Sequence, residues 1–281
     1  MARIPRPITS LLGYCLGWML WILPNSKRRN SYINLNLCLP EYHGFARHNL
    51  VRKSLIHESQ TLMEMPALMT LPGKRISSLI TKVSGLEYLQ HAMAQDSGTI
   101  LAIPHLGNWE MVGLYCSSHY PMTSLYKPQH RSPKLDIFIR NARERMGATL
   151  VPTDTSGVKA LYRALENNHV LGILPDQNPG KSGAVFAPLF GHTASTMVLI
   201  PRLAKRNKST VLFCYAQRLG WNGGFHIHFS PAPESIMDDD LLVATTTMNQ
   251  GLEQCIRQVP QQYWWSYKRF KKMPEGEKSP Y

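Results

Sequence analysis

Apolar and polar positions alternate in two different patterns along the middle of the chain. Short apolar runs have the length and composition of buried strands, and we expect strands over residues 99–104, 122–126, 148–151 and 170–175. Between them, apolar residues recur at helical spacing, which predicts helices over residues 109–118, 133–146 and 157–167. Further strands are expected near residues 210–217 and 225–230, and a helix near 239–258. Strands and helices that alternate in this way predict an α/β domain.

The segment before this alternation has a helical pattern and an apolar start. From about residue 45 to 97 apolar residues recur at helical spacing, and Pro66 and Pro72 are expected to kink or end helices. Residues 8–24 are almost uncharged, and a helix of that length reaches about 25 Å, slightly short of a hydrocarbon core of about 30 Å. We therefore expect an uncleaved membrane anchor over residues 1–30 and a single domain over residues 31–281. The pattern leaves open whether the anchor spans the bilayer or lies in one leaflet.

Positive charges flank the apolar run on both sides. Arg3 and Arg6 precede it, and Lys27-Arg28-Arg29 follow it directly. A cleaved signal peptide is the alternative interpretation, but the basic triplet opposes export and no small-x-small cleavage site follows the run.

The overall charge narrows the classes of partner. The 281 residues include 31 Lys and Arg and 18 Asp and Glu. The formal net charge of +13 favours anionic lipid, phosphorylated substrates or nucleic acid as partners. Zinc-binding spacings and an aromatic RNA-binding box are absent from the sequence, so nucleic acid is not expected. His226 and His228 would face one side of a strand without a third ligand nearby, so no metal site is predicted. The cysteines are expected to be reduced and mostly buried, and are Cys15, Cys38, Cys116, Cys214 and Cys255.

A histidine and a carboxylate follow the first central strand. His105 ends the apolar run, Gly107 and Asn108 interrupt regular structure, and Glu110 falls in the first turn of the next helix. The carboxylate would accept one ring N–H and leave the other ring nitrogen free to take a proton from a substrate hydroxyl. On spacing alone, a purely structural His–Glu hydrogen bond is the more common arrangement.

The residues around this pair resemble a known family. His105-Leu-Gly-Asn-Trp-Glu110 is similar to the H-x4-[DE] block of the lysophospholipid acyltransferase superfamily, and specifically to the bacterial lipid A biosynthesis (late) acyltransferases, in which Glu replaces the more usual Asp. Further segments resemble the same family in the same order, and they lie at residues 126–128, 140–147, 174–180, 185–191 and 263–271. The resemblance covers roughly residues 45 to 272.

This resemblance implies a fold and a reaction. The fold would be a mixed sheet flanked by helices, of the glycerolipid-acyltransferase type. The reaction would move a fatty acyl chain from an acyl-carrier-protein thioester to a hydroxyl of a lipid A precursor, at the cytoplasmic side of the bacterial inner membrane. His105 would deprotonate the hydroxyl and Glu110 would orient its ring, without a covalent acyl-enzyme. Neither a metal nor a cofactor is implied.

Further candidate residues are expected to bind substrate. The resemblance implies a functional arginine in residues 140–147, and Arg140 and Arg143 share a helix face from which Arg145 points away. A solvated basic helix face is the alternative.

Two more candidates follow the strand at 170–175. Asp176 and Gln177 stand where the superfamily has a phosphate-binding block, and they depart from it. Asp176 is expected either to hold Arg143 or Arg202 or merely to cap a turn, and Gln177 to donate to a sugar or phosphate oxygen. Because His105 and Asp176 each follow a strand, the two are expected to converge on one cleft.

Two alternatives remain at this stage. One is the same chemistry on another glycolipid or an aminolipid, and the other is a non-catalytic protein that binds anionic lipid. The sequence leaves the acyl chain length, the acceptor position and the oligomeric state open.

Overall fold

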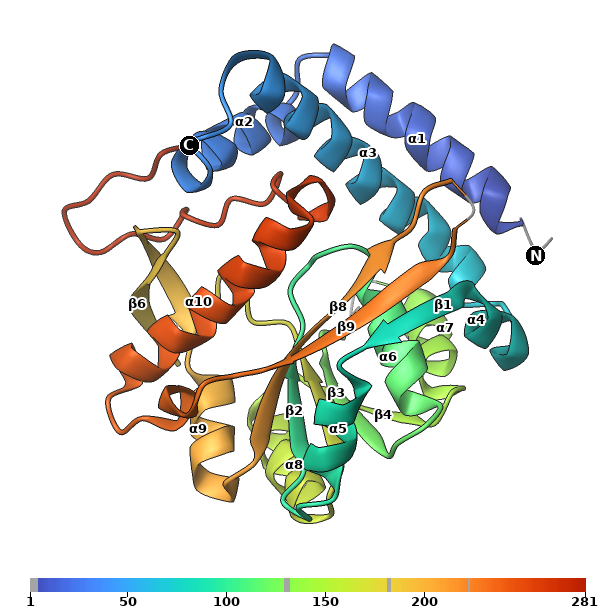
Figure 1. The fold of residues 1–281 in the computed structure, drawn as a ribbon, viewed down its shortest axis with the longest axis vertical. Helices are drawn as coiled ribbons and strands as arrows, with labels where there is room; N and C mark the ends of the chain where they lie inside the picture. Colours follow the sequence, from blue (N-terminus) through green and yellow to red (C-terminus); the bar gives the residue numbers. More distant parts are fainter. Residues whose placement is uncertain (1–4, 129–131, 181–182, 222) are drawn as a thin grey trace.

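A seven-stranded mixed sheet forms the centre of the protein, with strand order β1-β9-β8-β2-β5-β3-β4 (Figure 1). The structure is a computed structural model, which describes residues 5–128, 132–180, 183–221 and 223–281. Five pairs of neighbouring strands run parallel. Among the described residues of this sheet, β8 and β9 form the only antiparallel pair. The strands are β1 (Ile80–Ser84), β2 (Thr99–Ala102), β3 (Met122–Tyr126), β4 (Ala148–Pro152), β5 (Val170–Ile173), β8 (Thr210–Arg218) and β9 (Phe225–Pro231).

Helices cover both faces of the sheet because its strands are apolar on both sides. A separate hydrophobic core lies on each face of the sheet. Side chains of β2 alternate between the two cores, so that Ile100 and Ala102 lie in the first and Leu101 in the second. The first core is closed by α8 (Thr155–Glu166), α9 (Leu199–Asn207) and α10 (Leu241–Gln258). The second is closed by α4 (Gly73–Leu79), α5 (Leu86–Met93) and α6 (Trp109–Ser117). The expected mixed sheet flanked by helices is confirmed.

The expected elements between residues 99 and 175 all occur, with shifts of up to two residues at their ends. Helix α7 (Pro133–Glu144) lies between β3 and β4, and the expected strands β8 and β9 and helix α10 are also present. Asp240 caps α10 by accepting a hydrogen bond from the Leu242 backbone N–H at 2.8 Å. The helical pattern expected over residues 45–97 is wrong at residues 80–84, which form the edge strand β1. Elements that the apolar pattern did not predict are helix α2 (Ser26–Cys38), helix α9 and a hairpin of β6 (Ala184–Leu189) and β7 (His192–Met197).

The N-terminal helix α1 (Arg6–Ile22) lies along α3 (Gly44–Leu68), as Figure 1 shows. Two glycines make this close packing possible: a Cβ atom at Gly13 would lie 2.5 Å from the Gln60 Cα, and one at Gly17 would lie 2.3 Å from the Ile56 Cα. The outward side of α1 remains apolar and exposed. Pro66 lies inside α3, whereas Pro72 immediately precedes α4.

Taken alone, none of the described helices has the apolar length to cross a membrane. Helices α1 and α2 (Ser26–Cys38) reach that length only together, and the chain bends by 78° between them. Arg3, which the charge pattern placed before the apolar run, lies outside the described residues.

Helix α2 is polar yet well packed, because it binds the C-terminal segment. Asn30 donates to the Ser266 carbonyl at 3.1 Å, and Asn34 donates to the carbonyls of Trp265 and Tyr267, both at 2.7 Å. The segment that follows α10 is thereby held across the end of the sheet, next to the loop that carries His105.

Candidate active site

His105 and Asp176 meet because they follow neighbouring parallel strands at the same register. Ala102 of β2 pairs with Ile173 of β5, and each side chain lies three residues beyond its paired position. The His105 Nδ1 lies 2.7 Å from Asp176 Oδ1, and the His105 backbone N–H donates to Asp176 Oδ2 at 2.8 Å. The predicted convergence of these two residues is confirmed.

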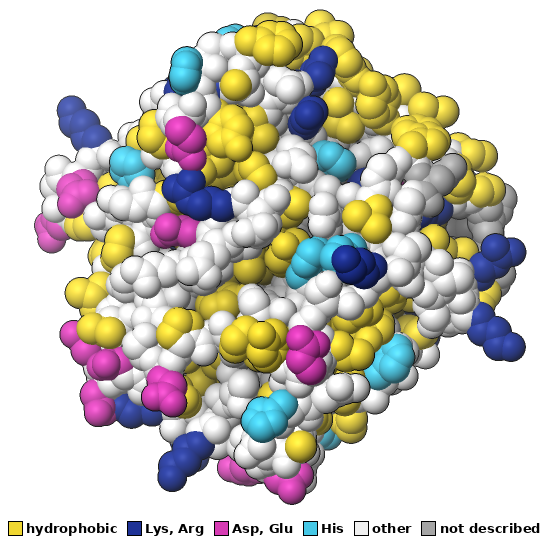
Figure 2. Space-filling model, in the orientation of Figure 1, with side chains coloured by type: hydrophobic (Ala, Val, Ile, Leu, Met, Phe, Trp, Pro, Cys, Tyr) yellow, Lys and Arg dark blue, Asp and Glu magenta, His cyan; other side chains and the backbone are white. Residues whose placement is uncertain are grey.

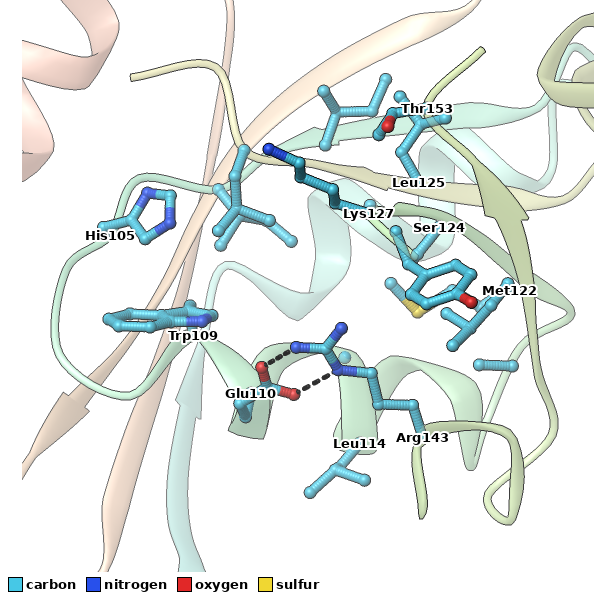
Figure 3. Close-up of a pocket in the computed structure, with 18 of the residues that line it drawn as sticks. His105, Trp109, Glu110, Leu114, Met122, Ser124, Leu125, Lys127, Arg143 and Thr153 are labelled. Atoms are coloured by element: carbon cyan, nitrogen blue, oxygen red, sulfur yellow. Dashed lines mark hydrogen bonds and ion pairs between the residues drawn. The ribbon is translucent and has the colours of Figure 1, made fainter. Parts of the chain in front are cut away.

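Glu110 does not orient the His105 ring, which corrects the sequence-based prediction. Both of its carboxylate oxygens accept hydrogen bonds from Arg143 of α7, one from Nε at 3.0 Å and the other from Nη2 (Figure 3). The physical reason is direction: the first turn of α6 aims Glu110 at α7, whereas the end of β5 aims Asp176 at His105. Asp176 accordingly holds neither Arg143 nor Arg202.

The Asp176 carboxylate is fully buried and remains ionised. Burial alone would raise its pKa, but the His105 ring, two hydrogen bonds from His105 and the nearby Arg269 guanidinium lower the pKa below its ordinary value. This interaction stabilises the folded state above the unfolded-state pKa of about 3.9, and the stabilisation is lost as the pH falls through the lower folded pKa. An ionised carboxylate on Nδ1 fixes the ring with its proton there and leaves Nε2 as the basic nitrogen.

Aromatic rings and an amide surround the basic nitrogen. Gln177 Nε2 lies 3.2 Å from His105 Nε2, and donates to it in this tautomer. Trp109 and Trp264 stack on each other with ring centroids 5.1 Å apart, and both contact the His105 ring. The Trp264 backbone N–H also donates to the His105 carbonyl at 3.2 Å. The His105 ring is therefore held by Asp176 at Nδ1 and by the two neighbouring tryptophan rings.

A cavity of about 360 Å³ opens beside His105. It runs along β3, β4 and β5 from the carboxyl ends of the strands, where His105 and Gln177 line it, down to Met122 and Ala148 at the strand starts. From Tyr126 back to Met122 this is a depth of about 13 Å at ~3.3 Å per strand residue. Most of the lining is apolar.

Two cations mark the polar part of the cavity. Arg143 lies on one wall, held by Glu110, and Lys127 reaches across with its amino group on the side of His105 (Figure 3). The Arg143 pKa is raised, because Glu110 outweighs the opposing effect of burial. Lys127 lies in the family-like segment at residues 126–128, for which the sequence predicted no role.

The other predicted basic residues lie away from the cavity. Arg140 is exposed, 3.7 Å from Glu144, and its guanidinium lies over the Tyr126 ring. Arg145 points away from Arg143, as expected, and donates to the Leu68 carbonyl at the end of α3.

Arg202, the last predicted basic residue, is exposed on α9. Sequence reasoning missed Arg269, which is buried near Asp176 and donates to the Ser195 carbonyl at 2.7 Å. Its place in the family segment at 263–271 was the available signal.

The candidate metal ligands and thiols have ordinary structural positions. His226 and His228 face the same side of β9, as predicted, with ring centroids 3.7 Å apart, and they contact Ser84 and Gln217 respectively. Four of the five cysteines are buried, and Cys15 is exposed.

Comparison with known proteins extends the local resemblance to the whole chain. A family model for bacterial lipid A biosynthesis acyltransferases matches residues 1–272. The chain belongs to the bacterial lipid A biosynthesis acyltransferase family. The described cavity, with its histidine at the mouth, thus lies in an acyltransferase of lipid A biosynthesis.

Three relatives in Escherichia coli K12 illustrate the range of this acyltransferase family. The chain is 28% identical to the lipid A biosynthesis lauroyltransferase, over 100% of this chain and 91% of the relative. It is 27% identical to the palmitoleoyltransferase, over 99% and 90% of the two chains. It is 26% identical to the myristoyltransferase, over 98% and 83%. The names of these acyltransferases specify different acyl chains, so similarity alone does not assign the chain that this protein transfers.

Proposed function

We propose that this protein transfers a fatty acyl chain from an acyl-carrier-protein thioester to a hydroxyl of a lipid A precursor, with His105 as the general base. The observation that carries the proposal is the ring of His105, fixed by a buried Asp176 at the mouth of an apolar cavity. In the reaction, His105 Nε2 takes the hydroxyl proton, the oxygen attacks the thioester carbonyl, and the thiolate leaves. Asp176 stabilises the imidazolium that forms.

The acceptor hydroxyl would take the place of the Gln177 amide at His105 Nε2. The amide hydrogen bond of 3.2 Å shows that a donor can reach this nitrogen, and a substrate O–H has the same polarity. Gln177 would then be released to donate to a sugar or phosphate oxygen of the acceptor.

Arg143 and Lys127 would bind the negative charges of this reaction. Glu110 is a positioning residue in this proposal, because its bidentate contact fixes the Arg143 guanidinium at the cavity wall. From there Arg143 would stabilise the oxyanion that develops on the thioester carbonyl. Lys127, and Arg140 at the outer surface of α7, would bind phosphate groups of the glycolipid.

The apolar cavity would hold the acyl chain, with Ala148 at the end that lies away from His105. Replacing Ala148 with phenylalanine should block the deep end, so that transfer of long acyl chains falls by about tenfold or more relative to short ones. Rates with a series of acyl-carrier-protein thioesters measure this preference. Thr149→Phe adds the same bulk on the exposed side of the same strand, and should leave the preference unchanged. A chain-length profile of Ala148→Phe that equals wild type would place the acyl chain elsewhere.

We infer that the exposed face of α1 contacts the cytoplasmic surface of the inner membrane. Six side chains of this apolar face are each about half exposed (Figure 2): Ile8, Leu11, Leu12, Met19, Ile22 and Leu23. Trp221, also about half exposed, contacts Tyr14 of α1 with ring centroids 6.1 Å apart. The exposed Arg29, in the first turn of α2, would meet anionic headgroups. The formal net charge of +13 would in addition attract acyl carrier protein, which is acidic.

Charges placed on this face should weaken membrane binding. The double variant Leu12→Glu, Met19→Glu should bind vesicles of anionic lipid at least about tenfold more weakly, since two half-exposed apolar side chains no longer enter the lipid. Activity on a detergent-dispersed acceptor should stay near wild type. Leu242→Glu, an exposed leucine on α10, is the matched control. Unchanged vesicle binding of the double variant would remove α1 from the membrane contact.

The function is tested by the lipids of cells with and without this gene. Mass spectrometry should show that the lipid A fraction gains one acyl ester when the wild-type protein is present and none when His105→Ala replaces it. An added acyl group on another glycolipid or on an aminolipid would identify that lipid as the acceptor instead. No change in any lipid would favour a non-catalytic lipid-binding protein.

A further inference from the structure

A fully buried carboxylate outside the cavity joins three parts of the chain. Glu64 of α3 is 0% exposed. Its Oε1 accepts a hydrogen bond from Arg6 Nε of α1 at 3.3 Å, and its Oε2 accepts one from Arg218 of β8. The Asn108 amide, from the loop after His105, donates to the same Oε2 at 3.3 Å. The proposed acyl transfer uses none of these contacts directly.

The charges around Glu64 depend on one another. The Arg6 and Arg218 guanidinium carbons lie 4.7 and 5.3 Å from the centroid of the Phe225 ring, so both cations approach the same apolar side chain. Burial and the proximity of Arg218 lower the pKa of Arg6, and Glu64 opposes this effect. A buried carboxylate with two guanidinium partners has little freedom to rotate, because any other orientation leaves a buried charge unpaired.

Asn108 contacts this carboxylate instead of capping its own helix. It occupies the N-cap position of α6, where an asparagine side chain ordinarily accepts a backbone N–H, but here it makes no capping bond. Its Nδ2 donates to Glu64, and its buried Oδ1 has no hydrogen-bond partner among the described residues. The side chain is therefore used to connect the loop to α3.

The rest of the loop is fixed by backbone contacts. The Thr61 hydroxyl, also on α3, donates to the Gly107 carbonyl at 3.0 Å, and the Gly107 N–H donates to the Gln262 carbonyl at 3.0 Å. The Asn108 N–H donates to the Ala216 carbonyl at 2.9 Å. Gly107 has a φ of +63°, and a Cβ there would lie 2.0 Å from that same carbonyl oxygen. The loop has His105 at one end and Glu110, which holds Arg143, just past the other.

We propose that Glu64 is a positioning residue for the loop from His105 to Glu110, and that Arg6 makes helix α1 part of this support as well as a membrane contact. The inference rests on the proposed acyl transfer at His105. A shift of this loop would move the base and the Arg143 cation relative to each other. It would leave the apolar cavity, and with it acyl-chain binding, largely unchanged.

The test compares kcat and KM for variants of the connection and of its surroundings. Asn108→Ala and Glu64→Gln should each lower kcat by about tenfold to a hundredfold, the scale for a misplaced catalytic group, with KM within about twofold of wild type. Asn108→Ala leaves Glu64 paired with both arginines, so it decides the question if Glu64→Gln does not fold. Arg6→Met should lower kcat by about fivefold, and Arg6→Lys should restore most of it.

Gln60→Met is the matched control. Gln60 lies one turn before Glu64 and donates to the Ser10 hydroxyl at 3.1 Å, so its loss loosens α1 without touching the loop. Its kcat should equal wild type. If the Asn108 and Glu64 variants match this control while His105→Ala is inactive, the positioning role is refuted and the proposed function stands. If Arg6→Met alone matches the control, α1 has no part in the support. Wild-type activity of His105→Ala would refute both proposals.

Discussion

Replacing His105 with alanine should lower kcat by about 10²–10⁴-fold, the usual contribution of a general base. The substitution removes the proton acceptor and leaves Asp176 in place, buried next to the loop. Steady-state acyl transfer from an acyl-carrier-protein thioester to a lipid A precursor measures the effect. Circular dichroism and vesicle binding should remain as in wild type, because the ring makes no contact with α1 that the structure shows.

His119→Ala is the matched control for this loss. His119 is an exposed histidine just beyond the end of α6, where it contacts Ser118 and Tyr115. Its removal should leave kcat unchanged. Turnover of His105→Ala close to that of His119→Ala would show that another group accepts the proton.

Replacing Asp176 with asparagine should be nearly as damaging, lowering kcat by about 10²–10⁴-fold. The amide can no longer hold the Nδ1 proton firmly or stabilise the imidazolium, and the favoured tautomer of His105 is lost. The lowered pKa of Asp176 keeps this carboxylate ionised at neutral pH, as the proposed role requires. Steady-state acyl transfer measures this loss, and a kcat of Asp176→Asn equal to that of wild type would remove Asp176 from the reaction.

The variant Glu110→Gln distinguishes the role of Glu110 from that of Asp176, the other carboxylate near His105. This substitution weakens the contact to Arg143 but leaves the His105–Asp176 hydrogen bonds intact, so kcat should fall by less than in Asp176→Asn. A kcat of Glu110→Gln far below that of Asp176→Asn would return the orienting role to Glu110.

The sheet and the contact between His105 and Asp176 could be predicted from the sequence. Buried strands such as β2 and β5 are short apolar runs, and their carboxyl ends meet at one edge of the sheet, so the approach of Asp176 to His105 follows from their order. The partner of Glu110 could not be predicted in this way. It depends on how α6 and α7 pack on the sheet, and spacing within the His-x4-Glu block carries no information about Arg143.

Other features escaped prediction because their stability comes from tertiary contacts. Helix α2 is polar and is held by amides that bind the C-terminal segment, for example Asn34 to Trp265. Strand β1 is a short edge strand, and no local pattern in the sequence predicts its pairing with β9. The apolar run of α1 predicted a membrane contact, but not that Gly13 and Gly17 let the helix lie against α3, or that Arg6 reaches the buried Glu64. Such contacts join residues that lie far apart in the sequence.

The central claim is that the His105–Asp176 pair catalyses acyl transfer to a hydroxyl of a lipid A precursor. The most direct measurement incubates the purified protein with an acyl-carrier-protein thioester and the precursor, and weighs the products by mass spectrometry. Wild type should add one acyl ester to the precursor, whereas His105→Ala and Asp176→Asn should form product at no more than about a hundredth of that rate. An unmodified precursor with wild type, or equal product with all three proteins, would contradict the account.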